Sequence, residues 1–353
     1  MNRYVLIGGG TGGHCIPMNV LYDYIIKDSQ CIIITDTKGM RFFKNRPTES
    51  IIVLKKLINS QSQIAYLINL PYLFLKSLWI LLQVKPSALI GFGGYFTIPV
   101  ISAGWIIGIS VFIHEGNALI GKANKFLSNL AKKTFTTFNK TIDQNHNVFK
   151  KSLHVGLPIR YSDETRHNID TDQYTICVLG GSQGAKNLSF NVAEAINSVQ
   201  KQIKENIIVY HQCRKEDVSD IMQFYNSHQI TAKVKNYFSE MINLIANSNL
   251  IISRSGSSTV NEIINNGIPS ILIPFPHASD NHQYYNAKVL NEINCSVLIE
   301  DKNANAKNLE INILNYIKNK HKNLNISNQL KSLITYNPSL KICLLYTSDA
   351  ADE

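Results

Sequence analysis

The chain of 353 residues is 44% hydrophobic, which is enough for two ordinary domains, each with its own core. Its six cysteines are scattered without a C-x-x-C pair, which argues against a disulfide framework or a zinc site and for a reducing compartment. The net charge of +10 arises in residues 1–160, which hold 18 basic and 6 acidic residues. This half indicates an anionic partner, a membrane surface or a phosphorylated substrate, unless the charge serves only solubility. Nucleic acid is the least favoured partner, because the chain carries no nucleic-acid-binding motif.

The first half alternates short β-branched runs with helical stretches, a pattern that predicts a parallel sheet wrapped by helices. The expected strands are 4–7, 31–35, 87–91 and 110–114. The expected helices begin after Gly13, near residue 64 and after Tyr95. The segment 156–173 loses the apolar pattern and is interpreted as a linker. The alternation then resumes, with strands expected near 175–179, 206–210, 249–253 and 270–274.

These patterns predict an N-terminal domain over residues 1–158 and a C-terminal domain over 159–335. The remaining residues, 336–353, end in a stretch that differs in composition from the Lys/Asn-rich sequence before it. We therefore assign this tail to neither domain and leave open whether it is native. Residues 95–113 carry no charge, but Pro99, Gly104 and Gly108 favour a buried helix and strand over a membrane span.

A wide apolar stripe recurs at helical spacing within residues 64–82, and three lysines lie beside it. The stripe comprises Leu67, Leu70, Phe74, Leu78 and Leu81, with Lys55, Lys56 and Lys76 nearby. Two interpretations remain open: a helix that rests on lipid headgroups, and a helix with a broad core-facing side.

Two glycine-rich turns follow buried strands about half a chain apart. The first runs from Gly8 to Gly13, and the second from Gly180 to Gly184. Each can aim a helix N-terminus at a phosphate, so we expect function in a cleft between two α/β domains. The first turn also satisfies G-x-G-x-x-G and is followed by Asp36, which keeps an NAD-dependent dehydrogenase as a rival. His14, in the first turn of the next helix, is a candidate functional residue.

Further polar clusters follow other strands, at the sheet edge where open α/β folds bind ligands. Gly91–Tyr95 offers converging amides, and His114–Asn117 offers a carboxylate and an amide. In the second half, Ser253–Glu262 can present amides and hydroxyls to a diphosphate, and Glu262 can accept two ribose hydroxyls. The amides and acids of Pro274–Ala287 suit sugar hydroxyls.

Taken in order, these motifs resemble a family of bacterial glycosyltransferases with the GT-B fold, which is α/β with two Rossmann-like domains facing a central cleft. The matching text is Gly9–His14, Gly91–Tyr95, Glu115 with Asn117, Gly156-x-Pro158-x-Arg160, Gly180–Ala185, Ser253–Glu262, His282-Gln283 and Asn286-Ala287. The family moves N-acetylglucosamine (GlcNAc) from UDP-GlcNAc to lipid I, with inversion, and makes lipid II for peptidoglycan. Gly116 and Leu157 depart from the family, which usually has Gln and Asn at these positions.

The resemblance implies a role for each matching residue. The donor would be bound by Thr11, Gly12, Gly13, Asn117, Arg160, Ser182, Phe238, Ser239, Met241, Ser257, Ser258, Thr259, Val260, Asn261, Glu262 and Gln283. In this set Arg160 and Ser182 would hold the phosphates, the stretch around Phe238 would cover the uracil, and Gln283 would hold GlcNAc hydroxyls. The acceptor pyrophosphate would lie at Gly93, Gly94 and Tyr95.

The implied displacement needs a general base and a positive potential for the departing diphosphate. His14 is the favoured base, because a histidine of ordinary pKa near ~6.5 suits neutral pH, and Glu115 is the alternative. Helix N-termini and Arg160 would supply the potential, so we expect no metal and no cofactor. The basic half would rest peripherally on the anionic cytoplasmic face of the inner membrane. The rivals, in order, are another GT-B glycolipid synthase, a dehydrogenase, and a non-catalytic UDP-sugar-binding protein.

Overall fold

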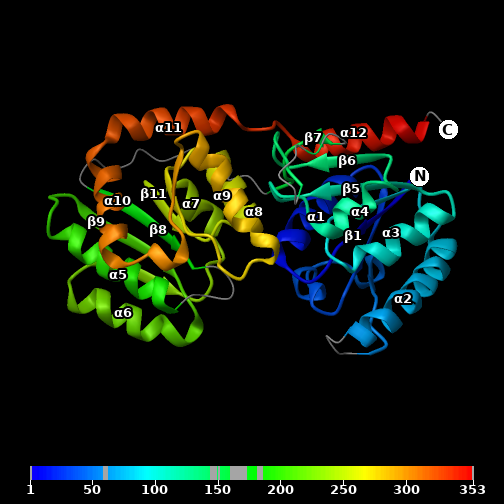
Figure 1. Cartoon of the computed structure of the whole chain (residues 1–353), viewed down its shortest axis with the longest axis horizontal. Coiled ribbons are helices and arrows are strands. Elements are labelled where there is room, and N and C mark those ends of the chain that lie inside the picture. The colour runs from blue at the N-terminus through cyan, green and yellow to red at the C-terminus, as the bar shows by residue number, and fades with distance from the viewer. Residues whose placement is uncertain are drawn as a thin grey trace. The chain divides into compact units, whose positions relative to one another are not determined.

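The computed structural model describes residues 2–58, 63–143, 149, 152–159, 173–180 and 186–351. The chain forms two compact units, which are described separately (Figure 1). Unit 1 comprises Met1–Ile159 with Thr335–Glu353, and unit 2 comprises Arg160–Ile334. Each has one parallel β-sheet flanked by helices, which confirms the predicted α/β class with two Rossmann-like domains.

Unit 1 contains a seven-stranded parallel sheet in the order β3-β2-β1-β4-β5-β6-β7. Its strands are β1 (Arg3–Ile7), β2 (Gln30–Thr35), β3 (Ile51–Val53), β4 (Ala88–Gly91), β5 (Ser110–Glu115), β6 (Lys133–Thr136) and β7 (Leu153–His154). β1 pairs with β2 on one side and β4 on the other, so the strand order reverses between β1 and β4. Open α/β sheets bind ligands at such a reversal, outside the carboxyl ends of the strands.

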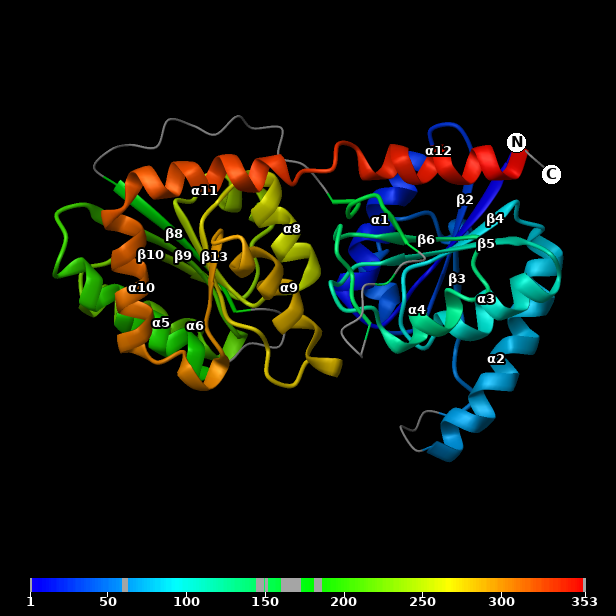
Figure 2. The ribbon, with the colours of Figure 1, turned by 45° about the horizontal axis from the view of Figure 1, so that its top comes forward.

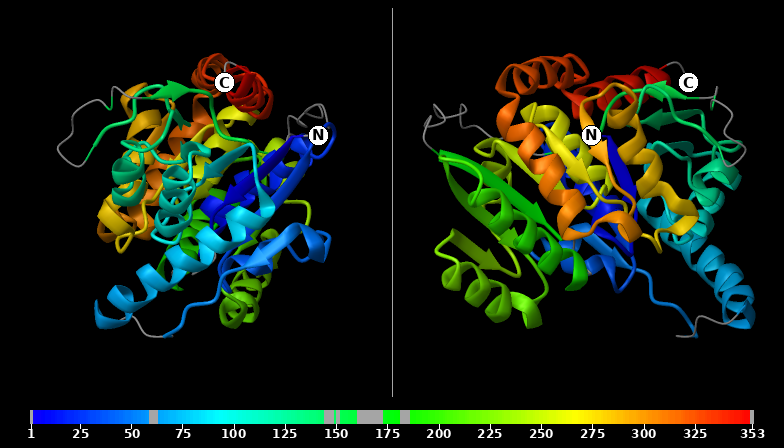
Figure 3. Two further views of the ribbon diagram at one scale, coloured as in Figure 1. Left: turned by 90° about the vertical axis from the view of Figure 1, so that its right-hand side faces the viewer. Right: turned by 60° about the vertical axis from the view of Figure 1, so that its left-hand side comes forward.

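Helices cover both faces of this sheet (Figure 2). They are α1 (Gly12–Ile25), α2 (Gln63–Val84), α3 (Thr97–Ile106), α4 (Lys122–Leu127) and α12 (Pro338–Ala351), with the short η1 (Gly39–Phe42) and η2 (Thr48–Ser50). Tyr4 and Leu6 point to the α1 side, and the alternate residues Val5 and Ile7 point to the side of α2 and α3. Figure 3 shows the N-terminal end of α2 extending beyond its neighbours in unit 1.

The C-terminal segment belongs to unit 1, although its sequence had been set apart from the rest of the fold. α12 packs on α1, and Ile342 is completely buried in the same core cluster as Leu6 and Phe112. The composition of the segment changes, but its apolar residues still lie at helical spacing and cover α1.

Unit 2 contains a six-stranded parallel sheet in the order β10-β9-β8-β11-β12-β13. Its strands are β8 (Gln173–Leu179), β9 (Asn206–Gln212), β10 (Thr231–Lys235), β11 (Leu250–Ser253), β12 (Ser270–Leu272) and β13 (Ser296–Leu298). Its helices are α5 (Lys186–Gln200), α6 (Val218–Ser227), α7 (Met241–Ala246), α8 (Ser257–Asn266), α9 (His282–Glu292), α10 (Ala306–Lys318) and α11 (Lys320–Ser332), with short η3 (Lys215–Asp217), η4 (Ser279–Asn281) and η5 (Asp301–Asn303). Here the order reverses between β8 and β11.

All eight predicted strands form, and the three predicted helices of the first half also form. The uncharged segment 95–113 contains the ten-residue α3 and the buried β5, as predicted. Within the described residues, no helix is both long and apolar enough to cross a membrane. Most of the predicted linker lies outside the described residues.

Candidate functional site

His14 lies at the carboxyl edge of the unit 1 sheet, in the first turn of α1 and half-buried. Its Nδ1 is 3.2 Å from the carbonyl oxygen of Gly9 and 3.5 Å from the hydroxyl of Thr11. A carbonyl oxygen can only accept, so the neutral ring carries its proton on Nδ1 and keeps the lone pair on Nε2. This is the tautomer that a general base at Nε2 requires.

The loop after β4 lies directly against this ring. A Cβ added to Gly93 would lie 3.4 Å from His14 Nε2, and one added to Gly94 would lie 3.5 Å from Cε1. Both glycines have positive φ, 95° and 84°, which other residues rarely adopt. Tyr95 is 58% exposed. The fold thus brings the predicted base and the predicted acceptor loop together.

Residues Thr11, Gly12 and Gly13, predicted to contact the donor, form the start of α1 and are exposed or half-buried. Their backbone amides belong to a helix N-terminus, where the partial positive charge favours an anion.

Glu115, the alternative base, is buried at the end of β5 and makes four hydrogen bonds. Its Oε1 accepts from the backbone amide (2.9 Å) and side-chain amide (3.1 Å) of Asn117. Its Oε2 accepts from the amide of Gly121 (3.0 Å) and from Nδ2 of Asn124 (2.9 Å). Both oxygens therefore hold the loop after β5, and Asn117 is oriented by this carboxylate.

Two residues of this edge were given no role by sequence reasoning. Asn124, on α4, also donates to the carbonyl of His114, while its own Oδ1 is buried without a hydrogen-bond partner. His114 donates from Nε2 to the carbonyl of Gly156 (2.9 Å) and stacks on Phe92. Burial lowers the pKa of His114 to about 4, so the ring stays neutral. The motif containing His114 was visible in the sequence, but the contact made by Asn124 from a later helix was not.

Asp36 is part of the first glycine turn's support rather than a free ribose-binding acid. Its Oδ1 accepts from the amides of Gly10 (3.0 Å) and Gly39 (2.6 Å). The carboxylate on which the dehydrogenase rival depended is thus engaged by its own loop.

The carboxyl edge of unit 2 carries the predicted diphosphate-binding segment. α8 begins at Ser257 after the N-cap Gly256, so the amides of its first turn face outward from the edge. The hydroxyls of Ser253 and Ser258 are buried and have no hydrogen-bond partner among the described residues. Buried hydroxyls normally find a partner, and a ligand oxygen would provide one. Thr259 and Asn261 are half-buried, whereas the Val260 side chain is fully buried, so only its backbone can meet a ligand.

Glu262 lies on α8 and is half-buried. Loss of hydration raises the pKa of its carboxyl to about 7. A carboxylate in this state gains from hydrogen bonds that stabilise its charge, which is what two ribose hydroxyls would donate.

A hydrogen-bond network joins this segment to the loop after β12. Ser255 donates to the carbonyl of Gln283 (2.7 Å), and Asn286 donates to the carbonyl of Ser255 (3.1 Å). Oε1 of Gln283 accepts from the amide of Phe275 (3.0 Å). The predicted sugar-binding Gln283 is therefore oriented by backbone contacts. Sequence reasoning included Ser255 in the run expected to meet a diphosphate, but it did not predict this contact with Gln283.

Arg254 supports the same loop with hydrogen bonds from its guanidinium. This buried residue donates to the carbonyls of Ile273 (3.2 Å) and Pro274 (3.0 Å) and pairs with Asp301 at 2.7 Å. Sequence reasoning gave its guanidinium no role, because its partners lie 19 and more residues away.

The predicted uracil-covering stretch precedes α7. The ring of Phe238 is buried in an edge-to-face contact with Tyr210, so its backbone rather than its ring is available to a ligand. Ser239 is exposed, and Met241 is half-buried at the start of α7. The neighbouring Tyr237 is 69% exposed.

Arg160 and Ser182, predicted to hold the phosphates, lie outside the described residues, as do residues 181–185 of the second glycine turn. In the part of the chain that the structure describes, no group of three or more His, Cys, Asp or Glu residues could hold a metal ion.

Two parallel α/β units, each with glycine-rich or serine-rich turns at its sheet edge, define the GT-B fold. The family model for the glycosyltransferase family 28 N-terminal domain matches residues 4–136, and that for the C-terminal domain matches residues 175–336. The crystal structure of Acinetobacter baumannii MurG has a TM-score of 0.81 at 23% identity and covers 99% of this chain and 100% of that one.

Two relatives carry the name UDP-N-acetylglucosamine–N-acetylmuramyl-(pentapeptide) pyrophosphoryl-undecaprenol N-acetylglucosamine transferase. That of Rickettsia bellii is 32% identical over 328 residues, covering 90% of this chain and 92% of the relative. That of Wolbachia pipientis is 30% identical over 328 residues, covering 93% of each chain. The chain therefore belongs to the MurG family of N-acetylglucosaminyltransferases.

Proposed function

We propose that this chain transfers GlcNAc from UDP-GlcNAc to the muramyl sugar of lipid I and so makes lipid II for peptidoglycan, with consequences for cell shape and division. The observation that carries the proposal is the close approach of the Gly93–Gly94 loop to the His14 ring, which would bring the proposed base next to the proposed acceptor-binding turn. The names of its relatives, 32% and 30% identical over most of their length, support the substrates.

In the proposed reaction, an acceptor hydroxyl attacks the anomeric carbon of GlcNAc as UDP leaves from the opposite face. His14 Nε2, whose lone pair is kept by the Nδ1 contact to Gly9, takes the proton of that hydroxyl. Glu115 holds the loop that bears Asn117, and we assign it a positioning role because both its oxygens are engaged.

The donor would bind across the unit 2 edge. The first-turn amides of α8 and the unpaired hydroxyl of Ser258 meet the diphosphate, and Glu262 accepts the ribose hydroxyls. Arg160 and Ser182 add phosphate contacts. The positive ends of helices stabilise the departing charge, so we propose that the reaction needs neither a divalent metal nor a cofactor. Turnover undiminished by a chelator would agree with this, and rescue by added Mg²⁺ after chelation would contradict it.

We further propose that unit 1 binds an anionic membrane surface peripherally on the cytoplasmic side. Apolar side chains are exposed along one stripe of α2 and at the end of α3, namely Ile68, Leu75, Trp79, Leu82, Trp105 and Ile106. Both helices lead by short connections into parallel strands, so their C-terminal ends share the amino edge of the sheet. An exposed apolar surface in a basic domain is typical of attachment to anionic lipid.

The two tryptophans of the chain, Trp79 and Trp105, both lie in this apolar surface, so intrinsic fluorescence tests the membrane proposal directly. We expect a blue shift with phosphatidylglycerol vesicles that weakens at high salt, and little change with phosphatidylcholine. Trp79→Phe and Trp105→Phe separate the two contributions. An emission spectrum unchanged by either vesicle would contradict the proposal.

The experiment that tests the transfer reaction offers radiolabelled UDP-GlcNAc with a short-chain lipid I analogue, and in parallel with a diacylglycerol. Product on the lipid I analogue alone supports the proposal. Product on diacylglycerol alone identifies a different glycolipid synthase. UDP-GlcNAc binding without product on either acceptor favours a non-catalytic binding protein.

A further inference from the structure

The first turn of α1, which carries His14, is weak by its own sequence. It begins with Gly12 and Gly13, each of which costs about 1 kcal/mol relative to alanine within a helix. Pro17 has no N–H to donate to the carbonyl of Gly13. The Thr11 hydroxyl lies beside Nδ1 of His14 rather than on an amide of the first turn. The position of this turn must therefore depend on contacts from outside the helix.

Those contacts come from the β2–β3 loop, residues 36–50. Asp36 Oδ1 accepts from the amide of Gly10, in the glycine turn itself. The ring of Phe42 lies against the start of the helix, since a Cβ added to Gly12 would be 3.4 Å from its Cε1. The loop thus touches the glycine turn at one point and the first helical turn at another.

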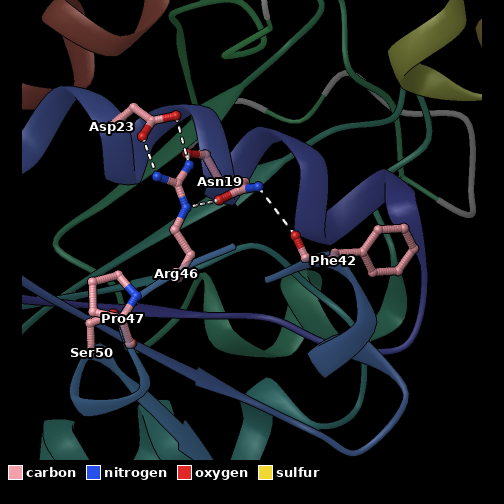
Figure 4. Close-up of polar contacts among 6 residues, drawn as sticks. All are labelled: Asn19, Asp23, Phe42, Arg46, Pro47 and Ser50. Atoms are coloured by element: carbon pink, nitrogen blue, oxygen red, sulfur yellow. Dashed lines mark hydrogen bonds and ion pairs between the residues drawn. The ribbon is translucent and has the colours of Figure 1, made fainter. Parts of the chain in front are cut away.

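Arg46 fastens this loop to the middle of α1 (Figure 4). Its Nε donates to Oδ1 of Asn19 (2.6 Å), and its Nη2 donates to the Asn19 carbonyl (3.2 Å) and to Oδ2 of Asp23 (2.7 Å). Nη1 pairs with the other oxygen of Asp23. The guanidinium also lies over the Tyr22 ring, 4.7 Å from its centroid. Asn19 in turn donates to the carbonyl of Phe42 (3.2 Å), which joins the two parts of the loop.

The geometry of this contact matters more than its charge. The Asp23 side chain is 49% exposed, and an ion pair to such a group is screened and worth little by itself. However, the guanidinium makes a bidentate contact with one carboxylate and stacks on a ring. Together these contacts allow only one orientation of the guanidinium. Arg46 itself is 14% exposed. Its contacts therefore fix where the loop lies along α1.

We propose that Arg46 is a positioning residue for the transfer reaction: it fixes the β2–β3 loop on α1, and the loop holds the glycine turn and His14 in place. The inference rests on the proposed function, in which His14 is the base. Asp23 lies nine residues beyond His14, roughly 13 Å along the helix. The nearer partner of Arg46, Asn19, lies five residues beyond His14, and the charge of Arg46 is paired with Asp23, so we expect Arg46 to act on His14 through position rather than through net charge.

The test compares Arg46→Ala and Arg46→Lys with the unchanged chain in the transfer assay, as a function of pH. We expect kcat of Arg46→Ala to fall about 10- to 100-fold, because a small displacement of a base is costly, while KM for UDP-GlcNAc changes less than twofold. The pH dependence of kcat should also shift. Arg46→Lys keeps the charge but not the bidentate geometry, so its kcat and pH profile should resemble those of Arg46→Ala more than those of the unchanged chain.

Arg3→Ala is the matched control. Arg3 also bonds two distant partners, Oε1 of Gln30 (2.8 Å) and the carbonyl of Val84 (2.6 Å), but at the amino edge of the same sheet. It should lower the unfolding temperature with kcat and the pH profile unchanged. If Arg46→Ala does not fold, Arg46→Lys and Asn19→Ala carry the same expectation.

The inference is overturned if folded Arg46 variants keep the original kcat and pH profile, or if Arg3→Ala loses kcat by the same factor for the same loss of stability. Absence of transfer by the unchanged chain is a different outcome, because it refutes the proposed function. In that case the His14 imidazole resonances of the Arg46 variants decide the positioning question, and unaltered shifts overturn it.

Discussion

The carboxyl edges of the two sheets differ in the state of their carboxyl groups. In unit 1, the carboxylates of Asp36 and Glu115 are engaged by amides of their own loops. In unit 2, burial raises the pKa of the Glu262 carboxyl to about 7, and the buried hydroxyls of Ser253 and Ser258 have no partner in the part of the chain that the structure describes. The unit 1 edge binds its carboxylates with amides of its own loops, whereas the unit 2 edge holds a desolvated carboxyl that hydrogen bonds from a ligand would stabilise.

This difference separates two tasks of a transferase. A base must be held within about 0.5 Å of its productive position, so we infer that the hydrogen bonds within the loops around His14 serve to position it. A nucleotide is instead recognised by groups whose hydrogen bonds it completes, which makes binding selective. Substitutions at each edge should therefore separate loss of catalysis from loss of nucleotide binding.

His14→Ala should reduce kcat by about 10²- to 10⁴-fold, the usual contribution of a positioned general base. UDP-GlcNAc affinity should change little, since we assign nucleotide recognition to unit 2. Steady-state transfer kinetics and calorimetric titration of UDP-GlcNAc measure the two quantities.

His154→Ala is the control, because His154 is a half-buried unit 1 histidine that contacts the Thr137 carbonyl away from the glycine turn. It should keep kcat near that of the unchanged chain. Equal losses of kcat and affinity in His14→Ala would reduce His14 to a binding residue.

Glu115→Gln should destabilise unit 1 by about 1–3 kcal/mol, the cost of leaving buried polar groups unpaired. Four donors surround the carboxylate, and an amide can accept at only one of its two ends. Chemical unfolding measures the loss, with the exposed Glu49→Gln as the control. A variant of unchanged stability that has lost all turnover would instead mark Glu115 as the base.

The fold was largely predictable from the sequence because buried parallel strands have continuous apolar runs, as in Val5–Ile7 and Leu250–Ile252. The strands that the pattern missed are short or polar. β3 and β13 have three residues each, and β10 reads Thr-Ala-Lys-Val-Lys at the sheet edge. Such segments become strands only because a neighbouring strand offers its hydrogen bonds.

The site was predictable where it depends on local sequence and not where it depends on distant contacts. The glycine turns, His14 and the start of α8 follow from motifs that lie next to strands. Asp36 occupies the position of a ribose-binding acid, but its carboxylate turns toward Gly10 and Gly39. The role of Asn124 depends on a partner nine residues away across a loop, which no motif encodes.

Among the described residues, the histidines His114 and His211 are buried and should affect the stability of the chain in acid. Burial lowers the pKa of His114 to about 4 and that of His211, whose Nε2 has no partner, to about 3. The unfolded chain takes up these protons below about pH 6.5, so stability falls as the pH decreases. The loss should end near pH 4 for His114 and near pH 3 for His211. At pH 5, each of the two histidines should already have lowered the free energy of unfolding by about 2 kcal/mol.

Unfolding of His114→Gln and His211→Gln at pH 7 and pH 5 measures these contributions. Each variant should lose less stability than the unchanged chain between the two pH values, whatever its stability at pH 7. The exposed His228→Gln serves as the control. An identical pH slope in all chains would show that neither buried ring controls acid unfolding.

The smallest expected effect concerns Glu262 and separates ligand recognition from catalysis. Its pKa of about 7 lies above the ordinary value of 4.5, so the carboxyl is partly protonated at neutral pH. Ribose hydroxyls donate to the ionised form and favour it, so UDP affinity should fall as the pH decreases below about 7, by at most about tenfold per unit. Glu262→Gln should bind UDP more weakly at pH 8 and lose this part of the pH dependence.

Calorimetric titration of UDP between pH 6 and pH 8 measures the effect, and the difference between chains removes the ionisation of UDP itself. Glu292→Gln is the control, since Glu292 is an exposed residue of α9 paired with Lys288. Parallel pH curves for Glu262→Gln and the unchanged chain would mean that the ribose does not meet this carboxylate. The contrast between the carboxyl groups of the two edges would then lose its chemical basis.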